Sequence, residues 1–269
     1  MSNRLSVFIP AYNEEGNIEA TVGELRSALQ TLAIEYEIII VNDGSRDRTA
    51  AIIEALAAGD SRIRVVHNPR NLGLAKTFIV GARAARFEYV GWIPGDNGFP
   101  AASLQQWLAP LGNADLVQTY LLNTEVRYLG RRMISRAYTR TMNALFGLKI
   151  KYYNGIQVYR RDLIQTVPTH SDGFALVSEI LVKLLAGGNS YIEVGINMQE
   201  RAQGESKAVK LKNILDVMKT VARLFFEIKI SQRKLYNARG ERRPWPPGTL
   251  TAATSQSGGQ IDGEGGRFS

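Results

Sequence analysis

Glu14, Asp43 and Asp96 each follow a run of apolar, largely branched residues, at the point where the sequence turns polar. Such runs are typical of buried strands, and the carboxyl ends of parallel strands meet at the edge of an open α/β sheet where ligands bind. A single acid at a strand end is commonly a turn former or a helix cap. Three of them, delivered to one edge, favour a binding site.

The elements that position these acids alternate along the first half of the chain. Segments of helical period such as Glu14–Leu32, where apolar residues recur every three or four positions, separate the strand-like runs. This alternation predicts a mainly parallel sheet with helices on both faces. Strands are expected at Leu5–Ile9, Glu37–Val41, Ile63–His67, Glu88–Ile93 and Asp115–Thr119.

The pattern changes in the second half. A long helical stretch covers Val126–Phe146, and a helix at Phe174–Ala186 lies between short strands near Gly155–Tyr159 and Tyr191–Val194. These segments are expected to complete the sheet and to build a second side of the site. Val209–Ile230 predicts an amphipathic helix, and the Pro-, Gly- and Ser-rich sequence after it predicts a disordered or extended tail.

Composition narrows the function. The 269 residues include 33 Lys and Arg against 25 Asp and Glu, a net charge of +8, which suits an anionic partner. No nucleic-acid-binding motif is recognisable, so phosphates and acidic membranes are the expected partners and nucleic acid is not. With no cysteine and two histidines, thiolate and imidazole metal sites are excluded or improbable. We expect neither a signal peptide nor a membrane-spanning helix.

Several segments carry a family resemblance. Ile9–Glu15, Val41–Asp47 and Asn71–Ala75 resemble the donor-binding half of the inverting glycosyltransferase family 2. Tyr153–Arg160 and Glu200–Lys207 are similar to its branch of dolichol-phosphate mannosyltransferases and bacterial polyprenyl-phosphate sugar transferases. The resemblance implies the GT-A fold, a Rossmann-like, mainly parallel sheet with helices on both faces, followed here by the amphipathic helix. The implied parts are a nucleotide-sugar-binding half (1–124), an acceptor-binding half (125–208), an interface helix (209–235) and a flexible tail (236–269).

The resemblance also implies a nucleotide diphosphate sugar as donor. A Mg²⁺ or Mn²⁺ ion would bridge Asp96 to the leaving diphosphate, because hard cations take one or two carboxylates together with substrate phosphates. The family usually has Asp-X-Asp here, but Pro94 stands at the first acidic position, so only Asp96 remains as metal ligand. The matching donor positions are Pro10, Ala11, Tyr12, Glu14, Asp43, Lys76 and Asp96.

Transfer to a hydroxyl requires a general base, whereas a phosphate acceptor is already an anion and requires cations. The acidic pair and the Gln-X-X-Arg-Trp motif of hydroxyl-transferring relatives are both missing. Arginines recur along Val126–Phe146 instead. From the polyprenyl-phosphate branch, the catalytic cations that hold the acceptor phosphate are expected to be Arg136, Arg201 and Lys207, acting opposite Asp96. Glu179 could position the sugar or an arginine.

A lipid phosphate acceptor requires access to a membrane. The basic, amphipathic Val209–Ile230 is expected to give peripheral contact with a bilayer on its cytoplasmic face, although packing onto the domain would explain the same apolar stripe. Two alternatives to the lipid-phosphate transferase stay open. One is a family 2 enzyme that acts on a hydroxyl of a glycan or lipid, and the other is a degenerate, donor-binding protein without activity. A nucleotidyltransferase would need a Gly-rich phosphate loop near the first strand, which is missing.

Overall fold

The computed structural model describes residues 4–173, 175–199 and 211–245, with side chains from residue 216 in the last range. Its centre is a seven-stranded sheet in the order β3-β2-β1-β4-β6-β5-β7. The strands are β1 (Arg4–Ala11), β2 (Glu35–Asn42), β3 (Ile63–His67), β4 (Tyr89–Trp92), β5 (Leu116–Leu121), β6 (Gln157–Arg160) and β7 (Tyr191–Ile196).

Most neighbouring strands run parallel, as the alternating sequence predicts. β1 pairs in parallel with β2 and β4, β2 with β3, and β5 with β7. β6 is the reversed strand, because it runs antiparallel to both β4 and β5. It lies between strands of the first half, so both halves of the chain share one sheet.

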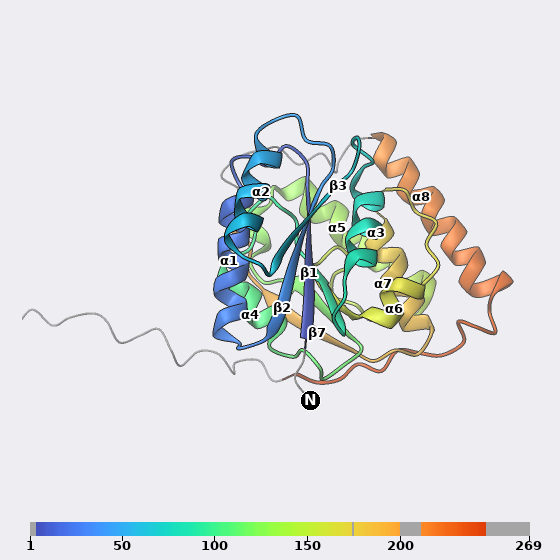
Figure 1. Cartoon of the computed structure of the whole chain (residues 1–269). Coiled ribbons are helices and arrows are strands. Elements are labelled where there is room, and N and C mark those ends of the chain that lie inside the picture. Colours follow the sequence, from blue (N-terminus) through green and yellow to red (C-terminus); the bar gives the residue numbers. More distant parts are fainter. Residues whose placement is uncertain (1–3, 174, 200–210, 246–269) are drawn as a thin grey trace, which may run out of the picture.

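Helices cover both faces of this sheet (Figure 1). On one face lie α1 (Ile18–Thr31), α2 (Thr49–Gly59) and α4 (Ala101–Leu108). On the other lie α3 (Leu74–Ala84), α5 (Leu129–Phe146), α6 (Arg161–Thr166), α7 (Leu176–Ala186) and α8 (Leu211–Phe226). A 3₁₀ turn, η1 (Thr124–Val126), precedes α5, and a π-helical turn, η2 (Glu227–Ser231), continues α8.

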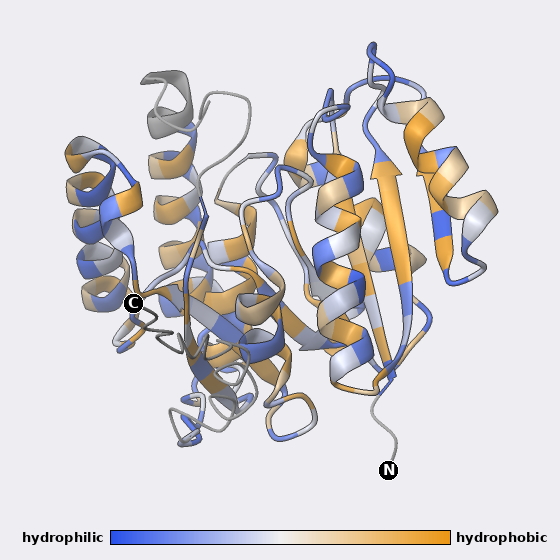
Figure 2. Ribbon diagram, turned by 90° about the vertical axis from the view of Figure 1, so that its left-hand side faces the viewer, coloured by the Kyte–Doolittle hydropathy of each residue, from blue (hydrophilic) through white to orange (hydrophobic). Residues whose placement is uncertain are grey.

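The hydrophobic core forms one layer on each side of the sheet, visible as the apolar strands and inward helix faces of Figure 2. Glycines allow the closest approach of helix to strand. A Cβ at Gly81 of α3 would lie 2.4 Å from the Phe8 ring, and one at Gly91 of β4 would lie 2.9 Å from Trp107 of α4. Both helices therefore pack tightly against β1 and β4, the strands that lead to the predicted site.

The end of α8 is fastened by buried charges. Lys183 of α7, which is 1% exposed, lies 3.0 Å from Glu179 and 2.9 Å from Glu227 of η2. The Lys183 ammonium also donates to the backbone carbonyl of Pro168 at 2.8 Å. Since breaking a buried ion pair costs about 3–5 kcal/mol, this cluster fixes where α8 ends relative to α7.

The chain then returns to the sheet. The amide of Tyr191 donates to Glu241, and the amide of Arg243 donates to Tyr191, both at 2.8 Å, so residues near Arg242 extend the free edge of β7. This short stretch is extended, while residues 246–269 lie outside the described part, so the flexible tail expected for 236–269 stays a prediction. Within that part, every helix is too short or too polar to cross a bilayer.

Candidate active site

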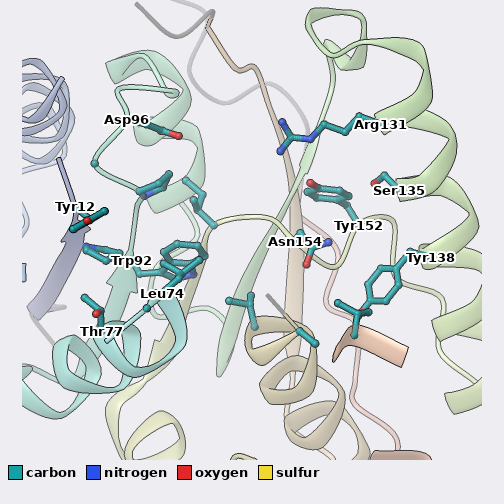
Figure 3. Close-up of a pocket in the computed structure, with 18 of the residues that line it drawn as sticks. Tyr12, Leu74, Thr77, Trp92, Asp96, Arg131, Ser135, Tyr138, Tyr152 and Asn154 are labelled. Carbon is teal, nitrogen blue, oxygen red and sulfur yellow. The ribbon is translucent and has the colours of Figure 1, made fainter. Parts of the chain in front are cut away.

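A large cavity opens where β1, β2 and β4 end. Its volume is about 1510 Å³, and it continues from these strand ends to α5 and α8. In Figure 3, Tyr12, Trp92 and Asp96 lie on one side, and Arg131, Ser135 and Tyr138 of α5 face them across the gap. Among the residues predicted for the donor, those that line the cavity are Pro10, Ala11, Tyr12, Glu14, Asp43 and Asp96.

Asp43 shapes the donor side by holding a loop. Its carboxylate, 4% exposed, accepts hydrogen bonds from the side chain of Asn68 at 2.9 Å and from the amides of Leu72 at 2.8 Å and Gly73 at 3.0 Å. A Cβ at Gly44, where φ is +67°, would lie 2.6 Å from the backbone of Arg70. The glycine thus allows the turn after β2 to meet the loop that Asp43 fixes.

The loop that carries Asp96 is held from two sides. Thr21 of α1 donates to the carbonyl of Gly95 at 3.1 Å and accepts from the amide of Asn97 at 2.9 Å. From the other side, Gln199 donates its side-chain amide to Asn97 at 2.7 Å. Asp96 is 8% exposed and lines the cavity. The carboxylate of Asp96 is therefore held in position without a ligand. Electrostatic stabilisation of a reacting group requires charges that are positioned in advance in this way.

Glu14 is tied to the start of α1 and to the start of α2. Its carboxylate accepts from the side-chain amide of Asn17 at 2.8 Å, and its own amide donates to the hydroxyl of Thr49 at 2.8 Å. The neighbouring Tyr12 points into the cavity (Figure 3). Together they form the rim of the cavity beside the ends of β1 and β2.

The opposite wall is a face of α5. Arg131, Ser135, Tyr138 and Met142 are three or four residues apart, so they lie on one side of the helix, and all line the cavity. Burial raises the pKa of Tyr138 to about 12, so its phenol stays neutral and cannot act as a base near neutral pH. Along this wall of the cavity a cationic side chain is therefore followed by two hydroxyl-bearing side chains and then by an apolar one.

Arg127 adds a second guanidinium at the same end of the cavity. It donates to the hydroxyl of Tyr152 at 2.7 Å and contacts the sulfur of Met198 at 3.1 Å. Asn123 holds Met198 through two hydrogen bonds to its backbone, at 2.7 and 2.9 Å. Arg127, which precedes α5, therefore joins the segment before β6 to the segment after β7 beside the cavity.

A chain of buried amides supports the cavity floor at Tyr152 and Asn154. Tyr159 donates to Gln157, Gln157 donates to Gln118, and Gln118 donates to the carbonyl of Tyr152 at 2.6 Å. Gly155 is required at this point, because a Cβ there would lie 2.3 Å from the carbonyl of Thr119. Fully bonded buried networks of this kind rigidify their surroundings.

Beyond the arginines the cavity becomes apolar. Its far end is formed by the middle of α5 and by α8, whose side chains meet where the rings of Phe146 and Phe225 lie 6.4 Å apart. Met218 and Phe226 of α8 are 62% and 56% exposed, so this helix is only partly covered by the domain. The apolar residues that line this end are Ile134, Met142, Leu145, Val217, Met218, Val221, Ala222 and Phe225.

Glu179 has no access to this cavity. It is 2% exposed, pairs with Lys183, and accepts from the amides of His170 at 3.0 Å and Ser171 at 2.9 Å. Its partner is thus a lysine rather than the arginine considered from the sequence. Among the described residues His170, Glu179 and Glu227 form the cluster with metal-ligand spacing, but the Lys183 ammonium already lies against both glutamates.

Other predicted residues are placed elsewhere. Lys76 is exposed on the first turn of α3 and is not among the residues that line the cavity. Arg136 lies on α5 but lines a smaller pocket, whereas Arg131 and Ser135 line the cavity. Arg201 and Lys207 fall outside the described residues. The roles of these four side chains stay predictions.

Residues 6–167 match the family model for glycosyl transferase family 2, which covers more than half of the chain. The chain belongs to glycosyltransferase family 2. Its fold is GT-A-like, as the sequence predicts. Its fold is similar to that of glucosyl-3-phosphoglycerate synthase from Mycobacterium tuberculosis, crystallised with Mg²⁺ and uridine diphosphate, with a TM-score of 0.63 at 19% identity over 82% of this chain and 79% of that one.

Two curated relatives illustrate the range of similarity. An undecaprenyl-phosphate 4-deoxy-4-formamido-L-arabinose transferase of Shewanella sediminis is 26% identical over 80% of this chain and 64% of its own length. An uncharacterized glycosyltransferase of Bacillus subtilis, EpsJ, is 41% identical over 38% of this chain and 28% of its own length. The chain thus spans less than two thirds of the length of either relative.

Proposed function

We propose that this glycosyltransferase moves a sugar, with inversion, from a nucleotide diphosphate sugar to a polyprenyl phosphate or a related lipid phosphate. One observation carries the proposal: a single cavity contains the carboxylates at the strand ends, then two arginines, then an apolar end between α5 and α8. In that order, these surfaces match the donor, the phosphate group of the acceptor and the hydrocarbon chain of the acceptor.

The donor occupies the side formed by the strand ends. Tyr12 and Glu14 flank the base and ribose, and the loop fixed by Asp43 closes over them. The structurally similar synthase binds uridine diphosphate, and a related crystal form contains UDP-glucose with Mn²⁺, which supports a nucleotide diphosphate donor for this chain as well.

The diphosphate requires a cation. Asp96 is the carboxylate of the cavity best placed to hold Mg²⁺ or Mn²⁺, and Gly98 leaves the carboxylate accessible, since a Cβ there would lie 3.1 Å from the Asp96 Oδ1 atom. One protein carboxylate fits such ions when substrate phosphates and water complete the shell. When bound, the ion would neutralise charge on the departing diphosphate.

The acceptor phosphate lies between Arg127, Arg131 and Ser135. Its oxygen attacks the anomeric carbon as the bond from that carbon to the diphosphate oxygen breaks, and a nucleoside diphosphate leaves. No proton has to be removed, because the attacking oxygen is already ionised near neutral pH. The arginines orient this anion and offset its repulsion from the diphosphate.

Transfer to a hydroxyl is less well supported. It would require a general base within hydrogen-bond reach of the acceptor, but Glu179 is buried beside Lys183 and Tyr138 is held neutral. Asp172 is exposed and is not among the cavity residues. A lipid acceptor in turn places the protein at a membrane, with the exposed side chains of α8 on the cytoplasmic leaflet.

The test is transfer from a panel of UDP-, GDP- and dTDP-sugars, with Mn²⁺ or Mg²⁺, to undecaprenyl phosphate and separately to undecaprenol. We expect product from the phosphate alone. Product from undecaprenol at a similar rate would refute the phosphate acceptor, and donor binding without turnover on either lipid would support the degenerate, inactive alternative.

Three single substitutions test whether the transfer takes place in this cavity. Asp96→Ala is expected to abolish transfer and Asp172→Ala to leave it unchanged, since Asp172 lies outside the cavity. Val221→Asp, which places a charge in the apolar end, is expected to abolish use of the long-chain acceptor while uridine diphosphate binding persists. Loss of transfer in Asp172→Ala, with donor binding retained, would instead indicate a catalytic base and a hydroxyl acceptor.

A further inference from the structure

A second pocket lies beside the cavity, on another face of α5. Its volume is about 270 Å³, and it lies between α5, the end of β5 and the segment before β6. It shares Arg127, Arg131, Ser135 and Tyr152 with the cavity, and these residues form the wall between the two. The remaining polar side chains include Arg132, Arg136, Thr139, Arg140, Lys151 and Tyr120.

The charges of this pocket have one sign. Arg132, Arg136 and Arg140 recur every four residues and therefore project from one side of the helix. Lys151 faces them, with its ammonium 4.0 Å from the centre of the Tyr120 ring. No Asp or Glu lines the pocket, and within the described residues none of these four cations forms a salt bridge.

The nearest acid in contact with this group is already engaged. Glu193 accepts a hydrogen bond from the amide of Lys151 at 2.7 Å and pairs with Arg242 at 3.2 Å. The Nε atom of Arg132 is buried and has no hydrogen-bond partner in the described structure. Like charges four apart destabilise a helix and a buried donor without an acceptor is costly, so both features point to an anion that is supplied from outside the chain.

We propose that the outer part of this pocket, formed by Arg132, Arg136, Arg140 and Lys151, is a second phosphate site beside the acceptor site, which takes a phosphate group from a lipid headgroup or in free form. Guanidinium groups pair with phosphate oxygens through two parallel hydrogen bonds. Tyr128, directly before α5, and Leu129 and Met133 on its first two turns are 57%, 64% and 61% exposed. Apolar side chains next to arginines match the acyl and headgroup layers of a bilayer. The proposal does not depend on sugar transfer.

The experiment compares Arg136→Gln/Arg140→Gln with Arg83→Gln/Arg86→Gln. Both pairs are exposed and remove two charges, but the second pair lies far along the chain, at the end of α3. In one arm, flotation measures binding to vesicles of phosphatidylcholine alone and of an equal mixture with phosphatidylglycerol. In the other, inorganic phosphate is titrated while the arginine Nε–H signals are followed by NMR.

Binding to the mixed vesicles is expected to fall about tenfold or more in the first pair and much less in the control pair. Vesicle binding without a response to inorganic phosphate supports a lipid source, and the reverse supports a free phosphate. Equal behaviour of the two variants in both arms would overturn the site. So would loss of transfer to undecaprenyl phosphate in the first pair with unchanged vesicle and phosphate binding, because Arg136 would then serve the acceptor.

Discussion

Replacing Asp43 with Asn separates a structural role of this carboxylate from direct contact with the donor. One oxygen accepts from Asn68 and Leu72, and the other accepts from the amide of Gly73. An asparagine side chain offers only one acceptor oxygen, so its amide group would face the Gly73 N–H, donor against donor.

The magnitude follows from these contacts. The variant loses one charge-assisted hydrogen bond, weakens two others and leaves the half-buried N–H of Gly73 without an acceptor. Each charged hydrogen bond contributes about 1.5–3 kcal/mol, so Asp43→Asn is expected to lower the free energy of unfolding by about 2–4 kcal/mol. The loop it releases lines the cavity through Asn71, Gly73 and Leu74, so affinity for uridine diphosphate should fall as well.

Urea unfolding followed by circular dichroism measures the first effect, with the slope of the transition as a check on two-state behaviour. Calorimetric titration with uridine diphosphate measures the second. Asp172→Asn makes the same change at an exposed site and should alter stability by less than about 0.5 kcal/mol. Wild-type stability of Asp43→Asn together with lost affinity would refute the reasoning, because the carboxylate would then act on the ligand alone.

Further predictions concern the loop that carries Asp96, the buried charges and acid stability. Gly98→Ala should displace the Asp96 carboxylate and slow transfer about tenfold or more, with a melting temperature close to that of the wild type; unchanged kinetics would argue against a role for this loop. Lys183→Met leaves two buried glutamates without a cation and should destabilise the protein by about 3–5 kcal/mol in urea unfolding at neutral pH; a neutral result would mean that the cluster does not hold α8. Burial raises the pKa of Glu37, but hydrogen bonds from Ser6, Arg64 and the Arg86 amide outweigh it and lower this pKa below 4.5. Its contribution to stability is therefore present above that pH and is lost as the pH falls through the lower, folded value, so Glu37→Gln should be less stable than the wild type near pH 7 and approach it in acid. An equal deficit at all pH values would contradict this assignment.

The sequence predicted the strand ends well because their signal is local. An apolar run followed by Glu14, Asp43 or Asp96 sets both the strand and the side of the sheet on which its polar end lies. The reversal of β6 has no such signal, since the residues of a four-residue strand do not indicate its direction. Its direction depends on pairing with β4 and β5, which are distant in sequence.

Lys76, which was expected near the donor, illustrates a second limit of prediction from the sequence. Lys76 follows the loop that Asp43 fixes, and nearness along the chain suggested nearness to the diphosphate. On α3, however, Ala75, Thr77 and Phe78 are the buried positions and Lys76 is exposed. The helix begins directly after Gly73, whose φ of +84° reorients the backbone. A shift of one position along α3 therefore determines whether a side chain faces the protein or solvent.

Which arginine of α5 faces the cavity depends on the orientation of the helix about its axis. The apolar residues of α5, rather than the basic ones, indicate that orientation. Five arginines spaced about four apart from Arg127 onward give no basis for choosing among them. Met142 and Phe146 are buried, so the face they occupy must turn toward the sheet. Stepping back by four and three residues from Met142 gives Tyr138 and Ser135, and a further four gives Arg131. Arg136 is one position from Ser135, about a quarter turn away, which directs it to the second pocket.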